Sequence, residues 1–180
     1  MRRLAAFSRN VRRGGRRARP TTSAAVVAAL LWLASAAWAG GTDPDDVALP
    51  LDIAGVSEGA DAGAVWLTVE TYDAFGDRAA DFTWTIDLDA DARTDLFVSA
   101  EWDAGLVAEV DNAAEEKIAD ASVARPSPTA LRVSFARSLL GGASSFNYNV
   151  VAVTDRNANG EADAGETDTA PDAGVYVLKM

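Results

Sequence analysis

The stretch FTWTIDL, residues 82–88, decides the fold class of this chain. Its large apolar side chains recur at every second position, with threonine or aspartate between them. A period of two places alternate side chains on opposite faces of a β-strand. We therefore predict a strand with one buried face, formed by Phe82, Trp84, Ile86 and Leu88.

The same alternation recurs along the rest of the chain, with turn-forming residues between the segments. It predicts further strands at 64–72, 96–102, 106–110, 117–124, 131–135, 146–152 and 175–178. The sequence RPSP at 125–128 breaks the pattern, and only 112–117 and 137–140 have short helical character. This organisation is typical of an all-β, antiparallel β-sandwich, jelly-roll-like, with roughly eight or nine strands.

Residues 1–39 have the pattern of a targeting segment. Residues 1–23 contain eight arginines and no acidic residue, and Ala24–Ala39 is an apolar run of 16 residues that ends in the small-residue sequence AWA. This run is short against the ~20 residues of a membrane-spanning helix. We predict a signal peptide cleaved before Gly40 and a secreted or cell-surface protein; the alternative is an uncleaved membrane anchor.

Cleavage would leave residues 40–180 as a strongly acidic chain. The full sequence has 16 basic and 27 acidic residues, and loss of the eight leader arginines leaves 8 basic against 27 acidic residues, a net charge of −19. That charge disfavours nucleic acid and anionic membranes as partners and favours cations. We expect a flexible start at 40–46, a single domain at 47–180, and no stable membrane insertion after cleavage.

The chain contains neither cysteine nor histidine. This composition excludes disulfides, Ser-His-Asp and Cys-His nucleophiles, and histidine-ligated zinc or iron sites. Carboxylate pairs, which serve in glycoside hydrolysis, mean little among 27 acidic residues. We predict a protein that is not an enzyme and has no catalytic residues.

Residues 155–166, DRNANGEADAGE, are spaced like the calcium loop of an EF-hand. Oxygen-bearing side chains fall at the ligand positions of such a loop, glycine stands at the sharp turn, and one ligand would be a backbone carbonyl. The flanking sequence is strand-like rather than helical, so the alternative is a solvated acidic turn. The predicted calcium ligands are Asp155, Asn157, Asn159, Glu161, Asp163 and Glu166.

A second acidic series, DLDADARTD at 87–95, has carboxylates at the first, third, fifth and ninth positions of such a loop. Ala92 replaces the turn glycine, and Val98 stands where the closing glutamate belongs. Carboxylates this close repel one another unless something screens them. The alternative is a set of outward strand residues and a turn residue. The candidate second metal ligands are Asp87, Asp89, Asp91 and Asp95.

From about Trp66 to Ala170 the chain resembles β-sandwich domains of secreted bacterial proteins that occur beside subtilisin-like proteases. The resemblance is carried by the strand and acidic turn at 82–95, RPSPTALRVSFARSLLGG at 125–142 and VVAVTDRNANGEAD at 150–163. The same order of elements resembles DOMON-type and family 9 carbohydrate-binding sandwiches. The resemblance implies a ligand, such as a sugar, held against aromatic rings.

Two tryptophans are the candidate ligand contacts under that resemblance. Trp102 begins a turn, and Trp66 lies on the strand face opposite Val65 and Leu67. Core packing is the alternative for Trp102, and packing against a second layer is the alternative for Trp66. Trp84 lies on the apolar face of its strand, and we predict it in the core.

Two functions remain open from the sequence. The first is an exported, calcium-binding, non-catalytic module for a carbohydrate or another extracellular ligand. The second is a structural or protein-interaction domain, cell-surface or protease-associated, in which calcium is purely structural. A ligand panel and a search for a protein partner would distinguish them.

Overall fold

The computed structural model describes residues 41–46, 51–75, 81–102, 105–154 and 166–180, which belong to one unit of the chain. The predicted leader 1–39 lies outside the described residues. The described residues form ten strands and one short 3₁₀ helix: β1 (Ile53–Ala60), β2 (Ala64–Thr71), β3 (Asp81–Asp87), β4 (Leu96–Trp102), β5 (Leu106–Asn112), β6 (Lys117–Ser127), β7 (Ala130–Ala136), η1 (Arg137–Leu140), β8 (Ser145–Val153), β9 (Thr167–Ala170) and β10 (Tyr176–Lys179). The all-β prediction is confirmed.

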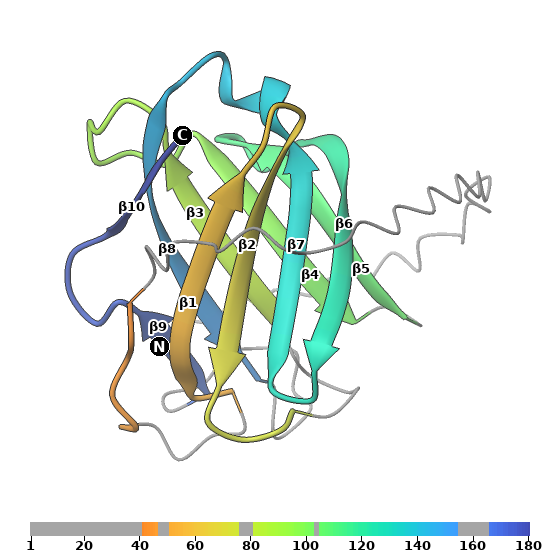
Figure 1. Ribbon diagram of the computed structural model, residues 1–180, viewed down its shortest axis with the longest axis vertical. Helices are drawn as coiled ribbons and strands as arrows, with labels where there is room; N and C mark the ends of the chain where they lie inside the picture. The colour runs from red at the N-terminus through yellow and green to blue at the C-terminus, as the bar shows by residue number, and fades with distance from the viewer. Residues whose placement is uncertain (1–40, 47–50, 76–80, 103–104, 155–165) are drawn as a thin grey trace, which may run out of the picture. The chain divides into compact units, whose positions relative to one another are not determined.

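The strands form one continuous antiparallel sheet in the order β1-β2-β7-β6-β5-β4-β3-β8-β10, with β9 also paired to β8 (Figure 1). The 11-residue strand β6 joins the two halves of this sheet. Its first part pairs with β5 and its second part with β7. The sheet therefore changes direction within β6 and becomes nearly barrel-like.

The core lies between the two halves of the sheet and is lined by alternate residues of each strand. In β3, Phe82, Trp84 and Ile86 are all 0% exposed, as the alternation predicts. The outward residues of β8 include Asn147 and Asn149, which are half-buried. The period-two pattern thus assigns each strand one face to the core and one face to the surface.

Side-chain contacts and a short N-terminal segment connect the two ends of the sheet. We define this segment, residues 41–46, as the strap. Thr42 of this strap forms an antiparallel bridge with Gly55 of β1. Across the gap, the backbone N–H of Ile53 donates to Asp168 Oδ2 of β9 at 2.6 Å. Part of the expected flexible start is therefore held against β1.

The segment 112–117, predicted as a short helix, is instead the turn between β5 and β6. Asn112 Oδ1 accepts hydrogen bonds from the backbone N–H groups of Ala114 at 2.9 Å and Glu116 at 3.1 Å. Such side-chain-to-backbone bonds offer the chain an alternative to a helix. The helical character of 137–140 is confirmed as the 3₁₀ turn η1.

The extent of β6 and the presence of β1 and β9 also differ from the prediction. The RPSP segment continues β6 as far as Ser127, because a register shift after Ala124 accommodates Pro126, which has no N–H to donate. Strand β1 was not predicted. Its bulge between Ile53 and Gly55 and the inward Glu58 interrupt the apolar alternation.

Candidate metal centre and adjacent pocket

Three aspartates from one loop come together beside the end of β3. Asp87 is the last residue of β3, Asp89 lies in the turn that follows, and Asp95 directly precedes β4. One carboxylate oxygen from each lies within 4.8 Å of the others. Asp87 and Asp95 are half-buried and Asp89 is exposed. This aspartate group can hold a metal ion.

Backbone hydrogen bonds hold the carboxylates in place. Asp87 Oδ1 accepts from Ala90 N at 2.7 Å, and its Oδ2 accepts from Ala92 N at 3.1 Å. Asp95 Oδ2 accepts from Leu88 N at 2.7 Å, which closes the loop. A carboxylate has about four lone-pair sites, so these bonds orient the oxygens and still leave sites for a cation.

The pKa of Asp87 lies below its ordinary value. Partial burial is the largest single influence and raises the pKa. The hydrogen bonds from Ala92, Ala90 and Asn147 favour the ionised form, and together they outweigh burial. The centre of the aspartate group is therefore held as a carboxylate, the form that binds cations.

Asp91, the fourth residue of the predicted series, is not part of the aspartate group. Its Oδ1 accepts from the backbone N–H of Arg93 at 2.9 Å, and its Oδ2 lies 3.8 Å from Arg93 Nε. Ala90 and Ala92 both have left-handed backbone conformations, with φ of 63° and 64°. The loop thus makes its sharp turn with alanines, each at a cost of roughly 1–2 kcal/mol.

Ala92→Gly is expected to raise the free energy of unfolding by roughly 0.5–1 kcal/mol, because glycine adopts a positive φ without a Cβ clash but loses more chain entropy on folding. Urea unfolding measures the change. Ala114→Gly is the matched control, since Ala114 is an exposed turn residue outside the left-handed region. Equal effects of both glycines would show that the backbone conformation of Ala92 is not the cause.

The second predicted calcium loop lies almost entirely outside the described residues. This applies to Asp155, Asn157, Asn159, Glu161 and Asp163. Glu166, its predicted closing ligand, is buried, and its carbonyl oxygen accepts from Thr154 N at 2.9 Å. Thr154 and Glu166 are therefore adjacent, and calcium binding by the loop stays a prediction.

The two predicted ligand-contact tryptophans lie on different parts of the sheet. Trp66, on β2, is half-buried, and its ring covers Gly59 of β1 so closely that a Cβ there would lie 2.4 Å from the indole. Trp102, at the end of β4, is 37% exposed. Strands β7, β6 and β5 separate β2 from β4 in the sheet, so no single aromatic platform contains both residues.

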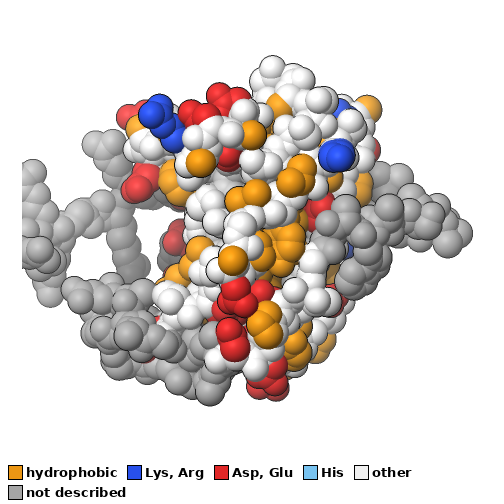
Figure 2. All heavy atoms as spheres, turned by 90° about the vertical axis from the view of Figure 1, so that its left-hand side faces the viewer, with side chains coloured by type: hydrophobic (Ala, Val, Ile, Leu, Met, Phe, Trp, Pro, Cys, Tyr) orange, Lys and Arg blue, Asp and Glu red, His pale blue; other side chains and the backbone are white. Residues whose placement is uncertain are grey.

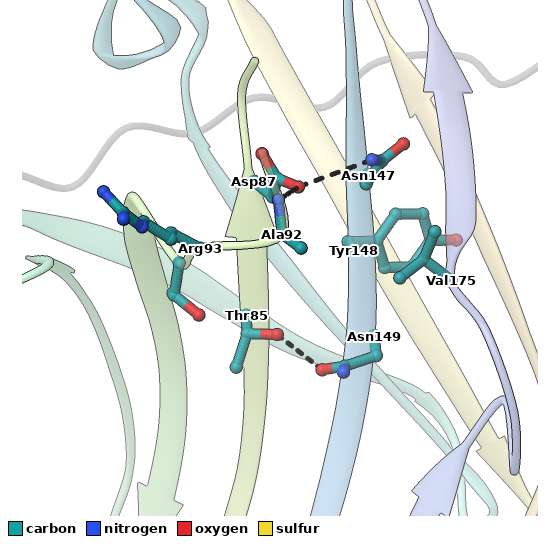
Figure 3. A pocket seen from close by; sticks show the side chains of 9 residues that line it. Thr85, Asp87, Ala92, Arg93, Asn147, Tyr148, Asn149 and Val175 are labelled. Carbon is teal, nitrogen blue, oxygen red and sulfur yellow. Dashed lines mark hydrogen bonds between the residues drawn. The ribbon is translucent and has the colours of Figure 1, made fainter. Parts of the chain in front are cut away.

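A shallow pocket of about 170 Å³ lies beside the aspartate group (Figure 3). The register of β3 with β8 places Thr85 opposite Asn149 and Asp87 opposite Asn147. Thr85 Oγ1 donates to Asn149 Oδ1 at 2.5 Å, and Asn147 Nδ2 lies 3.5 Å from Asp87 Oδ2. The pocket is lined by Thr85, Asp87, Ala92, Arg93, Thr94, Asn147, Tyr148, Asn149 and Val175.

Two buried carboxyl groups that the sequence did not single out lie where the ends of the sheet meet. Glu58 is 4% exposed, and its Oε2 accepts from Tyr148 OH at 2.6 Å. Asp43, in the strap, is also 4% exposed, and its Oδ2 has no hydrogen-bond partner among the described residues. Burial raises the pKa of both groups, that of Asp43 to about 6.

The acidic composition is visible on the molecular surface. Figure 2 shows the face that lies at the left of Figure 1, where β10 and the strap are found. Carboxylate side chains gather near both ends of this face, whereas lysine and arginine side chains lie near its upper end only. The carboxylate clusters on this face would attract cations.

Among the described residues, no helix has the length and apolar character needed to cross a membrane. Comparisons with protein-family models, with curated proteins and with solved structures found no match. The resemblance to DOMON-type and family 9 carbohydrate-binding sandwiches therefore stays a prediction.

Proposed function

We propose that this chain is an exported, calcium-binding, non-catalytic module of the β-sandwich class that binds a carbohydrate or another extracellular ligand. The observation that supports it best is the aspartate group, in which Asp87, Asp89 and Asp95 bring carboxylate oxygens within 4.8 Å of one another. Export rests on the pattern of residues 1–39.

The chemistry of the aspartate group favours a hard cation such as calcium over zinc, copper or iron. Ca²⁺ takes about 6–8 oxygen ligands in flexible geometry, and a loop of aspartates and backbone carbonyls offers such ligands. The chain has no histidine or cysteine, the ligands that favour zinc, copper or iron. An ion here would also offset the mutual repulsion of the three carboxylates, which would fasten the loop between β3 and β4.

A thermal melt with excess calcium, and again with a chelator, tests the proposed ion. Extracellular calcium modules bind with dissociation constants on the order of 10⁻⁴ to 10⁻³ M. At a hundred times that constant, calcium should add about 2.7 kcal/mol to the free energy of unfolding. Asp89→Ala should remove most of this gain, because it deletes one of the converging carboxylates without touching the core.

Asp91→Ala is the matched control, since Asp91 belongs to the same loop but not to the aspartate group. It should keep the response to calcium. A response that survives Asp89→Ala but disappears in Asp155→Ala would assign the ion to the 155–166 loop instead. No response in the parent protein would contradict calcium binding altogether.

A structural or protein-interaction role is the second candidate. Two exposed apolar side chains near the paired ends of β4 and β5 favour it. Trp102 is 37% exposed and Val107 is 42% exposed, and they lie on opposite faces of the sheet because Trp102 pairs with Leu106. In that case calcium would only stabilise the fold. A protein partner whose capture depends on Trp102 and Val107, together with no small-molecule ligand, would support this role.

A further inference from the structure

The pocket beside the aspartate group has both polar and apolar walls, and strands β3 and β8 supply its hydrogen-bonding side chains Thr85, Asn147 and Asn149. Asn149 Oδ1 accepts from Thr85 Oγ1, which leaves the two N–H donors of the Asn149 amide without a partner among the described residues. Among the described residues, the side chain of Asn147 makes one long hydrogen bond, 3.5 Å from its Nδ2 to Asp87 Oδ2. Donors and acceptors therefore remain available at the pocket wall (Figure 3).

The size and shape of the pocket limit what can enter it. Its volume of about 170 Å³ is smaller than the roughly 300–1,000 Å³ of sites for drug-sized ligands. It is open to solvent, so a single small ring, or the end of a longer chain, can occupy it. One wall is apolar, because Val175 beside Tyr148 is 51% exposed.

The charges around the pocket select against anions. Asp87 lines it, and Asp89 and Asp95 lie within the same group of carboxylates. Arg93 also lines the pocket, and Asp91 partly offsets its positive charge, because Asp91 Oδ2 lies 3.8 Å from Arg93 Nε. The carboxylates outnumber this one arginine, so a neutral ligand is favoured over one that carries a carboxylate or phosphate.

We propose that this pocket binds a neutral carbohydrate ring. The hydroxyl groups of the sugar would form hydrogen bonds with Asn149, Asn147 and Thr85, and a C–H face of the ring would pack against Val175. A sugar has both a hydroxyl-bearing edge and less polar C–H faces, and neutral amides supply donor and acceptor together. The proposal rests on the proposed non-catalytic binding function and names its ligand class and its position. It places the ligand away from Trp66 and Trp102.

Amide-detected NMR of the ¹⁵N-labelled protein tests the proposal with glucose, galactose, mannose, N-acetylglucosamine and cellobiose as probes. Glucuronate and glucosamine serve as the anionic and cationic comparators. At least one neutral sugar should shift the side-chain amide signals of Asn147 and Asn149, and glucuronate should bind less well than glucose. Asn149→Ala and Thr85→Ala should each weaken binding about tenfold, since hydrogen-bonding groups are left unsatisfied.

Thr83→Ala is the matched control, because Thr83 is the next outward residue of β3 and does not line the pocket. It should leave the affinity unchanged, as should Trp102→Ala. Binding that is lost with Trp102→Ala and kept with Asn149→Ala would overturn the proposal, and so would no shift with any neutral sugar or a preference for the charged sugars.

A thermal melt of the same protein with and without calcium distinguishes failure of the proposed sugar pocket from failure of the proposed calcium site. A stabilising response to calcium without sugar binding would overturn the pocket and leave calcium binding in place. Sugar binding that needs Asn149 but persists in chelator, with no calcium-dependent stabilisation, would support the pocket and contradict the ion.

Discussion

Replacing Trp84 by alanine is expected to lower the free energy of unfolding by about 3–5 kcal/mol. Trp84 is 0% exposed, and its ring centroid lies 6.3 Å from that of Phe82. Its β3 position pairs with Val98 of β4 and Val150 of β8, so the cavity would open in the middle of one half of the sheet. Because domains are stable by only about 5–15 kcal/mol, the variant should be marginally folded in urea titrations.

A Trp84→Phe variant tests whether lost packing causes the destabilisation. The indole Nε1 of Trp84 is buried with no hydrogen-bond acceptor among the described residues. Phenylalanine keeps much of the apolar volume and removes an unsatisfied donor whose burial costs about 1–3 kcal/mol. We expect it to lose less than half as much stability as the alanine variant. Equal losses would mean that the indole N–H has a partner and that the interior there is polar.

The stability of the protein should fall as the pH rises through 6, and Asp43 should account for much of that fall. Burial and, after it, the carboxylates of Asp168, Asp172 and Asp46 raise the pKa of Asp43 from 3.8 to about 6, against a backbone hydrogen bond from Asp172 that lowers it. A raised pKa means that the folded state binds the proton more tightly than the unfolded state. The protonated Asp43 therefore contributes its whole stabilisation below pH ~4, and this contribution is lost by pH ~7. The free energy of unfolding falls by about 3 kcal/mol over that range.

Urea unfolding between pH 4.5 and 7.5 in chelator measures this effect, and about 2 kcal/mol of the loss should fall in that window. Asp43→Asn should flatten the pH dependence and raise stability at pH 7.5, because the amide keeps an acceptor for the Asp172 N–H and carries no charge. Asp45→Asn is the control, since Asp45 is an exposed residue of the same strap. If both variants keep the full pH dependence, other buried acids such as Glu58 and Asp168 cause it.

The sequence predicted the strands with strict alternation and failed where a strand lacks it. The strands predicted at 82–88 and 146–152 match β3 and β8, because large apolar side chains recur at every second position and only a strand buries such a set on one face. Strand β1 breaks this rule, since Glu58 points inward where an apolar residue is expected. Glu58 is stabilised in the core by the hydrogen bond from Tyr148, which lies 90 positions further along the chain.

The candidate site was predictable to the same extent. Asp87, Asp89 and Asp95 lie within nine residues of one another. Because such a short acidic series forms a local loop, its spacing is sufficient to predict that the carboxylates lie close together. The sequence did not predict that Asp91 lies outside the aspartate group. Its position follows from the left-handed backbone at Ala90 and Ala92, a conformation that alanine rarely adopts. The sequence did not predict the pocket either, since the pocket requires the register of β3 against β8, in which Thr85 lies opposite Asn149, 64 positions further along the chain.

By itself the sequence determined the antiparallel all-β class, the inward and outward faces of most strands, and the acidic loop after β3. These properties depend on neighbouring residues, whose side chains alternate or converge whatever the rest of the chain does. The tertiary structure alone decided which strands pair, that Thr85 and Asn149 share one pocket, and that Asp43 and Glu58 are buried. Those outcomes depend on contacts between distant segments, and burial changes the pKa of a carboxyl group only once the sheet has closed around it.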